Sequence, residues 1–121
     1  MPASDFWLGL DQLITDNKLC VDRPKGSPHP NYPSLVYPLD YGYLENTRSA
    51  DGDGLDVWIG SLNTKVTGII CTLDLQKRDA EIKLLLGCTS HEARQALAIH
   101  NVGSQVGLLL ERTWQTEPRR R

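Results

Sequence analysis

The stretch best suited to metal binding or catalysis is a short acidic run, Asp51-Gly52-Asp53-Gly54-Leu55-Asp56-Val57. Three carboxylates fall within six residues, and two glycines leave the backbone free to fold those side chains together. Like charges at such close range repel and raise one another's pKa unless a cation neutralises them. A hard divalent ion held by oxygen ligands would neutralise them. The run therefore predicts a metal site just before a buried strand over residues 55–60.

Three interpretations of the acidic run compete. A calcium-binding EF-hand loop needs Asp or Asn at its fifth position and Gly at its sixth. Leu55 and Asp56 stand there, and no pair of helices flanks the run, so an EF-hand is disfavoured. The other two are a polar turn with solvated aspartates and a magnesium site. Magnesium favours a few carboxylates together with water and substrate phosphates, so the neighbouring residues decide between these two.

Three further groups in the sequence suit an anion bound beside such a metal. Pro24-Lys25-Gly26-Ser27 offers a cation and a turn with free amides, although these residues are also ordinary turn chemistry. The block 37–43 carries phenols that either donate hydrogen bonds to phosphate or fill a core with one polar end exposed. Glu81 and Lys83 alternate with apolar residues, so on a strand they share one face. There they would either serve a metal and a phosphate together or form a solvent-facing ion pair.

The elements that position these residues are predicted from periodicity. Apolar residues recur at helical spacing over residues 5–16, and Thr89 followed by Glu92 is a capping box that opens a second helix ending near residue 100. A hairpin turn is expected at 77–80. The expected strands cover residues 19–21, 55–60, 66–75, 81–87 and 106–114. Because long parallel crossovers are missing from this order, it predicts an antiparallel or barrel-like α+β domain.

Residues 22–43 differ in kind from the rest of the chain. They contain five of the seven prolines and all four tyrosines. The prolines exclude a helix, and the segment is too aromatic for a disordered linker. We therefore expect an ordered loop that lines a site.

Length and composition bound the class of protein. A chain of 121 residues with 40% hydrophobic and 23% charged residues has room for one domain with one real core. No apolar run would span a membrane and the start carries no secretory signal pattern, so we expect a cytoplasmic protein without a membrane partner. Cys20, Cys71 and Cys88 show no metal-binding spacing and are expected to be buried free thiols.

The charge distribution argues against a nucleic-acid partner. Without the three terminal arginines the chain holds 10 basic and 15 acidic residues. A nucleic-acid surface needs clustered positive charge, which this balance does not offer. The Arg-rich tail, residues 117–121, is expected to be frayed.

Taken in order, these stretches resemble the soluble, family I inorganic pyrophosphatases, with this chain as a short divergent member. The signature Asp-x-Asp-x-hydrophobic-Asp-hydrophobic is fulfilled by residues 51–57, and a Tyr-Pro-x-x-Tyr-Gly-Tyr block precedes it. The stretches that match are 22–27, 37–43, 51–57 and 81–84, within residues 20–100. The resemblance implies one domain over 1–121: a small distorted five-stranded antiparallel, OB-like β-barrel with peripheral helices.

The resemblance also implies a role for each matching side chain. Asp53 would orient or deprotonate the attacking water. The implied metal ligands are Asp22, Asp51, Asp56 and Glu81. The implied phosphate-binding residues are Lys25, Tyr41 and Lys83. The cofactor would be Mg²⁺, with Mn²⁺ as a substitute, the substrate pyrophosphate or a related small phosphate, and the assembly a homo-oligomer.

The chain departs from the family pattern mainly in its phosphate-binding residues. After Pro-Lys-Gly-Ser the family has Lys-Tyr-Glu, where this chain has Asn31-Tyr32-Pro33. A family hairpin that carries a phosphate-binding Arg is missing, and Arg23 or His29 would substitute for it in part. A second hairpin Asp of the family aligns with Gln76, or with Asp74 if the register slips, and its late Tyr-Lys pair falls at 100–101.

Three functions therefore stay open at the level of the sequence. One is Mg²⁺-dependent hydrolysis of inorganic pyrophosphate to two phosphates. Another is a phosphohydrolase that acts on a different phosphate ester or on a nucleotide. The last is a non-catalytic module that binds a metal or a phosphate group.

Overall fold

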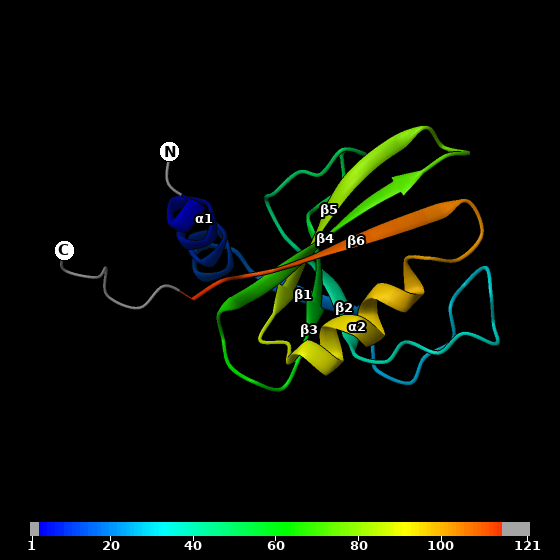
Figure 1. Ribbon diagram of the computed structural model, residues 1–121, viewed down its shortest axis with the longest axis horizontal. Helices are drawn as coiled ribbons and strands as arrows, with labels where there is room; N and C mark the ends of the chain where they lie inside the picture. The colour runs from blue at the N-terminus through cyan, green and yellow to red at the C-terminus, as the bar shows by residue number, and fades with distance from the viewer. Residues whose placement is uncertain (1–2, 115–121) are drawn as a thin grey trace.

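The computed structural model describes residues 3–114, and it contains two helices and six strands (Figure 1). In chain order these are α1 (Ala3–Asp16), β1 (Leu19–Arg23), β2 (Asp40–Leu44), β3 (Asp56–Ile59), β4 (Val66–Asp74), β5 (Asp79–Leu86), α2 (Ser90–Ile99) and β6 (Gln105–Glu111). Within the described residues neither helix is long and apolar enough to cross a membrane. The frayed tail expected at 117–121 lies outside them.

The six strands form one sheet in the order β1-β2-β3-β5-β4-β6. The α+β class predicted from the sequence is confirmed. The sheet has six strands with two open edges, where five antiparallel strands in a barrel were expected, and β3 and β5 run parallel. The reason is that β4 and β5 form a hairpin in which β5 returns between β4 and β3, and so runs in the direction of β3.

Strand alternation gives the sheet two faces with different cores. One face packs Leu44, Val57 and Leu84 against Trp7 and Leu10 of α1. The other face carries a second core, which comprises Tyr37, Leu39, Trp58, Ile70, Leu85, Cys88 and the α2 residues Ala93 and Ala96. Successive strand residues point to opposite faces, so α1 and α2 cover opposite sides of the sheet.

A buried ion pair fixes α1 to the sheet. The carboxylate of Asp11 accepts hydrogen bonds from Arg112 Nη1 at 3.0 Å and from the Val66 amide at 2.9 Å. Arg112 also donates to the Val66 carbonyl at 2.9 Å. The side chains of Arg112 and Asp11 are 8% and 13% exposed, so water contributes little to their solvation. Removing one charge would leave the other buried without a counter-ion.

The proline-rich segment is an ordered loop, as the sequence predicts. Its two arms are joined by hydrogen bonds from the Gly26 amide to the Tyr37 carbonyl, from the Tyr37 amide to the Ser27 carbonyl, and from the His29 amide to the Leu35 carbonyl. The segment differs from the expectation at its ends, because β1 extends to residue 23 and residues 40–44 form β2. The tyrosine block is therefore partly strand and contributes rings to the core.

The expected capping box opens α2, and a buried histidine closes it. The Thr89 hydroxyl accepts the Glu92 amide at 3.1 Å, and the Glu92 carboxylate accepts the Thr89 amide at 2.9 Å. At the other end His100 Nε2 accepts the indole N–H of Trp58 at 2.9 Å. An indole N–H only donates, so the imidazole proton lies on Nδ1 and is donated to Gln105 Oε1 at 2.7 Å. Burial lowers the pKa of His100 to about 4 and keeps it neutral.

Of the three free thiols, only Cys88 is buried, which corrects the expectation for the other two. Cys20 lies on the edge strand β1, where its Sγ donates to Glu45 Oε2 at 3.2 Å. Cys71 lies on the α1 face of β4 and is half-buried. Edge position and incomplete cover by α1 explain why these thiols stay accessible.

Removing the Asp11 carboxylate should loosen α1 from the sheet. We expect Asp11→Ala to lower the free energy of unfolding by about 3 kcal/mol, because Arg112 is left buried without a partner. Urea denaturation measures this loss. Asp5→Ala, an exposed change on the same helix, is the control. A loss as small as that of the control would show that the ion pair does not anchor α1.

His100 should make the fold sensitive to acid. Its pKa in the folded chain, about 4, lies below its ordinary value of about 6.5, so the unfolded chain binds the proton first as the pH falls. Stability should therefore drop by up to about 3 kcal/mol between about pH 6.5 and pH 4. Urea denaturation of the unaltered chain and of His100→Gln across this window measures the effect. Equal slopes in the two chains would refute it.

Candidate metal and phosphate site

The side chains best suited to chemistry lie on the α2 face of the sheet, at the start of β3 and in the middle of β5. Trp58 and Leu85 belong to the core on that face. Asp56 stands two residues before Trp58, and Lys83 stands two residues before Leu85, so alternation places both on the same face. The two strands are parallel neighbours in a register that pairs Val57 with Leu84, which brings Asp56 and Lys83 side by side.

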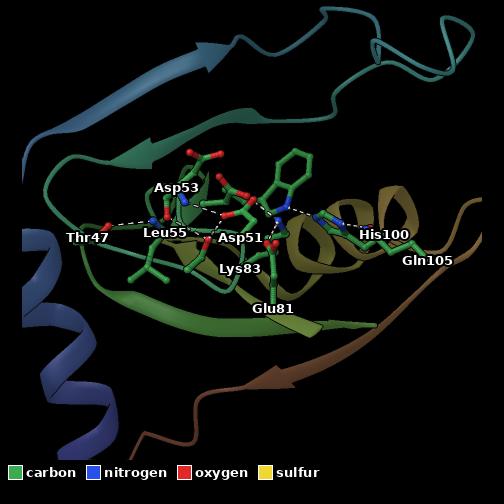
Figure 2. A network of polar contacts seen from close by, with 11 residues as sticks. Thr47, Asp51, Asp53, Leu55, Glu81, Lys83, His100 and Gln105 are labelled. Carbon is green, nitrogen blue, oxygen red and sulfur yellow. Dashed lines mark hydrogen bonds and ion pairs between the residues drawn. The ribbon is translucent and has the colours of Figure 1, made fainter. Parts of the chain in front are cut away.

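Lys83 is the centre of this cluster. Its Nζ donates to Asp56 Oδ2 at 2.6 Å and to Glu81 Oε1 at 2.8 Å. The side chains of Lys83 and Glu81 are each 10% exposed, so this is no solvent-facing ion pair. Burial would lower the pKa of Lys83, but the adjacent charges and hydrogen bonds of Asp56 and Glu81 outweigh it and raise the pKa. Lys83 is thus a fixed ammonium between two carboxylates (Figure 2).

The acidic loop, residues 47–55 before β3, is held in its conformation by its own hydrogen bonds. Asp51 Oδ1 accepts the Ser49 hydroxyl at 2.7 Å and the Asp53 amide at 3.0 Å. These two bonds, with the positive charge of Lys83 behind them, lower the pKa of Asp51. Thr47 closes the base of the loop, since its hydroxyl accepts the Leu55 amide at 2.9 Å. The loop therefore favours the ionised form of Asp51. Figure 2 shows this side chain on the side of Lys83.

Three carboxylates from separate parts of the chain line one pocket of about 340 Å³. Asp22 comes from β1, Asp53 from the acidic loop and Asp56 from β3. Tyr43, which pairs with Asp56 across the β2–β3 ladder, completes the wall together with Gly54. A side chain at position 54 would come within 2.5 Å of the Leu44 carbonyl oxygen, so glycine is what allows the loop to approach β2.

The donor chemistry of this pocket fits a hard divalent cation, because its side-chain donors are oxygens and three of them belong to carboxylates. The spacing is wider than a closed ligand set. Among residues 3–114 no three His, Cys, Asp or Glu side chains converge as a metal site. Asp56 and Glu81 instead share the ammonium of Lys83.

Two further predicted phosphate ligands occupy different environments. Tyr41 is largely buried, and burial, followed by the charge of Asp56, raises the pKa of its hydroxyl strongly. Tyr41 thus stays protonated and able to donate. Its ring packs on Trp58 with centroids 4.5 Å apart. Lys25 is exposed, and its backbone amide donates to Asp40 Oδ1 at 2.8 Å, which fixes the turn at the start of β2.

The two candidates for the second hairpin position are Asp74 and Gln76. They do not line the acidic pocket, which is the pocket of Asp22, Asp53 and Asp56. Asp74 Oδ1 accepts the Gln76 and Lys77 amides at 3.0 Å and the Ser104 hydroxyl at 2.9 Å, so it closes the β4–β5 turn. Both residues line another pocket, of about 250 Å³, whose wall includes His29, Asn31 and Tyr32.

The residues that fix the acidic loop were missed by sequence reasoning. Ser49 and Thr47 hold Asp51 and Leu55 in place, and Trp58 supports Tyr41. The local signal for such a turn is Asp51 itself, because a short polar side chain can accept the backbone amide two residues on, here that of Asp53. The sequence carries no such signal for Trp58, because a Trp within an apolar strand is typical of an ordinary core residue.

Comparison with known proteins adds independent information on this arrangement. The family model described as inorganic pyrophosphatase matches residues 12–82, more than half of the chain. An inorganic pyrophosphatase of Geobacillus stearothermophilus is 35% identical over 60 residues, 42% of this chain and 36% of that protein. One of Leifsonia xyli subsp. xyli is 44% identical over 46 residues, 36% of this chain and 28% of that protein.

A solved structure, the inorganic pyrophosphatase of Helicobacter pylori, superposes with a TM-score of 0.57 at 14% identity. The superposition covers 79% of this chain and 83% of that one, and at this identity it shows the fold alone. In sequence, the chain aligns with about a third of the length of the curated relatives it matches. The family match begins in the last turn of α1, includes the acidic loop and ends within β5, and on this evidence the chain belongs to the inorganic pyrophosphatase family.

Proposed function

We propose that this chain, as a single domain over 1–121, hydrolyses inorganic pyrophosphate to two phosphates with Mg²⁺. The observation that carries the proposal is the buried Lys83 ammonium between Asp56 and Glu81, beside a pocket lined by three carboxylates. A cation next to carboxylates suits phosphoryl transfer, in which catalysis is mainly positioning and neutralisation of charge. Membership of the family supports the same reaction.

The metal in this proposal is Mg²⁺, for which Mn²⁺ would substitute. We propose that its ligands are Asp22, Asp51, Asp56 and Glu81. When bound, Mg²⁺ lowers the pKa of a coordinated water and neutralises phosphate charge. These carboxylates are the hard oxygen donors that the ion prefers.

Other side chains would accept the proton of the attacking water and bind the phosphates. Asp53 is an exposed carboxylate on the glycine-flanked loop, and it would accept the proton of the attacking water. Lys83 would donate from Nζ to a phosphate oxygen, which replaces one of its present carboxylate partners. Tyr41 would donate its hydroxyl proton to the same phosphate, since its raised pKa keeps it protonated. Lys25, on its exposed turn, would bind the second phosphate.

A second candidate is hydrolysis of a less charged phosphate ester or a nucleotide. Asn31 and Pro33 stand where the resemblance places a Lys and a Glu. The pocket beside them is lined mostly by neutral groups such as His29 and Tyr32, and its one ammonium, Lys77, is matched by the carboxylate of Asp74. Fewer cations mean fewer charge-assisted contacts to a highly charged substrate.

A non-catalytic module that binds metal or phosphate is the remaining alternative. For each candidate we further propose a cytoplasmic homo-oligomer.

Asp53→Asn should remove turnover without disturbing the fold. Asp53 is exposed, and the proposed role is acceptance of one proton, so we expect phosphate release from pyrophosphate with Mg²⁺ to fall at least about 100-fold. Asp5→Asn, an exposed change on α1, is the matched control. Unchanged release in Asp53→Asn would overturn the role of this residue. If the unaltered chain releases phosphate only from other esters, the second candidate replaces the first.

Magnesium should raise the melting temperature of the chain, because a ligand that binds the folded state stabilises it. The shift should be smaller in Asp56→Asn, which removes a proposed ligand. Thermal unfolding with and without Mg²⁺ measures both. A shift without turnover of any phosphate substrate would favour the binding module. No shift with either Mg²⁺ or Mn²⁺ would contradict the metal site itself.

A further inference from the structure

The hydroxyl of Tyr41 is held in place by the rings around it. Its oxygen lies on the long axis of the ring, so rotation about χ2 leaves it in place and rotation about χ1 moves it. Tyr41 pairs with Trp58 across the β2–β3 ladder, and the two ring centroids lie 4.5 Å apart. The ring of Tyr37 lies 5.5 Å away. Burial raises the pKa of the Tyr41 hydroxyl, and the nearby charge of Asp56 raises it further.

A buried indole therefore decides how far the ring of Tyr41 is free to move. Trp58 is fully buried, and its Nε1 donates to His100 Nε2 at 2.9 Å. Rotation of the indole about χ2 would break this bond and leave a buried N–H unpaired, which is costly. The hydrogen bond thus selects one orientation of the indole.

His100, which accepts this bond, is itself fixed by its neighbours. Its amide donates to the Leu97 carbonyl at 2.9 Å, and its Nδ1 donates to Gln105 Oε1 at 2.7 Å (Figure 2). A side chain at position 107 would come within 3.2 Å of the His100 Cβ, so Gly107 allows β6 to pack closely on the histidine. Both ring nitrogens of His100 are engaged, so the imidazole is not free to bind a phosphate itself.

We propose that Gln105, His100 and Trp58 are positioning residues, which hold the Tyr41 hydroxyl where it meets a bound phosphate. The inference rests on the proposed function, which assigns Tyr41 to the phosphate. Each contact restrains the next side chain: Gln105 orients the imidazole, the imidazole orients the indole, and the indole blocks the swing of the Tyr41 ring. The hydrogen bonds of these three side chains do not include the Lys83 ammonium or its carboxylate partners, so their effect passes through Tyr41.

A double-mutant cycle tests whether His100 acts through Tyr41. His100→Leu removes the acceptor of the indole N–H. We expect it to lower kcat/KM for pyrophosphate with Mg²⁺ at least about tenfold, since a small misplacement of a positioned group is costly. In the Tyr41→Phe background the same change should cost less than about twofold, because the hydroxyl that it misplaces is gone. The loss in His100→Leu should divide between kcat and KM in the same proportion as in Tyr41→Phe.

Matched variants separate positioning from a general effect on the fold. His91→Leu makes the same change at an exposed position of α2 and should keep full activity. His100→Gln should restore most of the activity, because a carboxamide offers one acceptor and a donor, as a neutral imidazole does. Circular dichroism checks that each chain folds. If His100→Leu does not fold, Gln105→Leu, at a half-buried position that begins β6, takes its place in the cycle.

Additive losses in the two backgrounds would overturn the proposal, because they would show that His100 acts independently of Tyr41. Unchanged kcat/KM in folded His100→Leu would also overturn it. The same cycle is measured on the affinity for inorganic phosphate with Mg²⁺ by isothermal titration calorimetry. A chain that binds phosphate without hydrolysing pyrophosphate contradicts the proposed function, and the binding cycle then decides the positioning. A chain that binds no phosphate overturns the positioning as well, since Tyr41 would have no phosphate to meet.

Discussion

The site depends on one electrostatic arrangement, the ammonium of Lys83 held between the carboxylates of Asp56 and Glu81. Two carboxylates on neighbouring parallel strands would repel each other if no cation separated them. Lys83 provides that cation within the chain, and its raised pKa keeps it charged. The same charge acts on Asp51, whose pKa is lowered chiefly by Ser49 and the Asp53 amide. Asp56 and Glu81 are thus assembled around a cation of the chain itself before any external cation binds. A phosphate that recruits Lys83 would free carboxylate oxygens beside a pocket already lined by acids, which couples the two binding events.

The sheet separates this chemistry from the structure that supports it. On the α1 side, the buried Asp11–Arg112 pair and an apolar core stabilise the domain. On the α2 side, the packed rings of Trp58 and Tyr41 belong to the core, next to the ionic cluster of Asp56, Glu81 and Lys83. Neutral His100 accepts a hydrogen bond from the indole N–H of Trp58, so these rings are fixed by a hydrogen bond that needs no charge.

The sequence predicts the local features of this molecule better than its long-range pairing. The helix over residues 5–16, the capping box at Thr89 and the α+β class are confirmed, because each is encoded by spacing over a few residues. The return of β5 between β4 and β3 is a non-local event that no periodicity encodes. The roles of the acidic residues stay predictions. Their spacing identifies a candidate cation site, but the partner that Asp56 adopts in the absence of a metal, Lys83, follows only from the strand register.

The coupling of Lys83 to a bound phosphate is the most direct point of test. Nitrogen-15 NMR of the lysine side chains in Asp53→Asn, a chain expected to fold and not to turn over, would report the surroundings of each ammonium. On addition of pyrophosphate with Mg²⁺, the account predicts a clear change in the Nζ resonance of Lys83 and none in that of Lys65, an exposed lysine at the start of β4. A Lys83 resonance that does not respond would show that its ammonium remains with Asp56 and Glu81, and it would contradict the account.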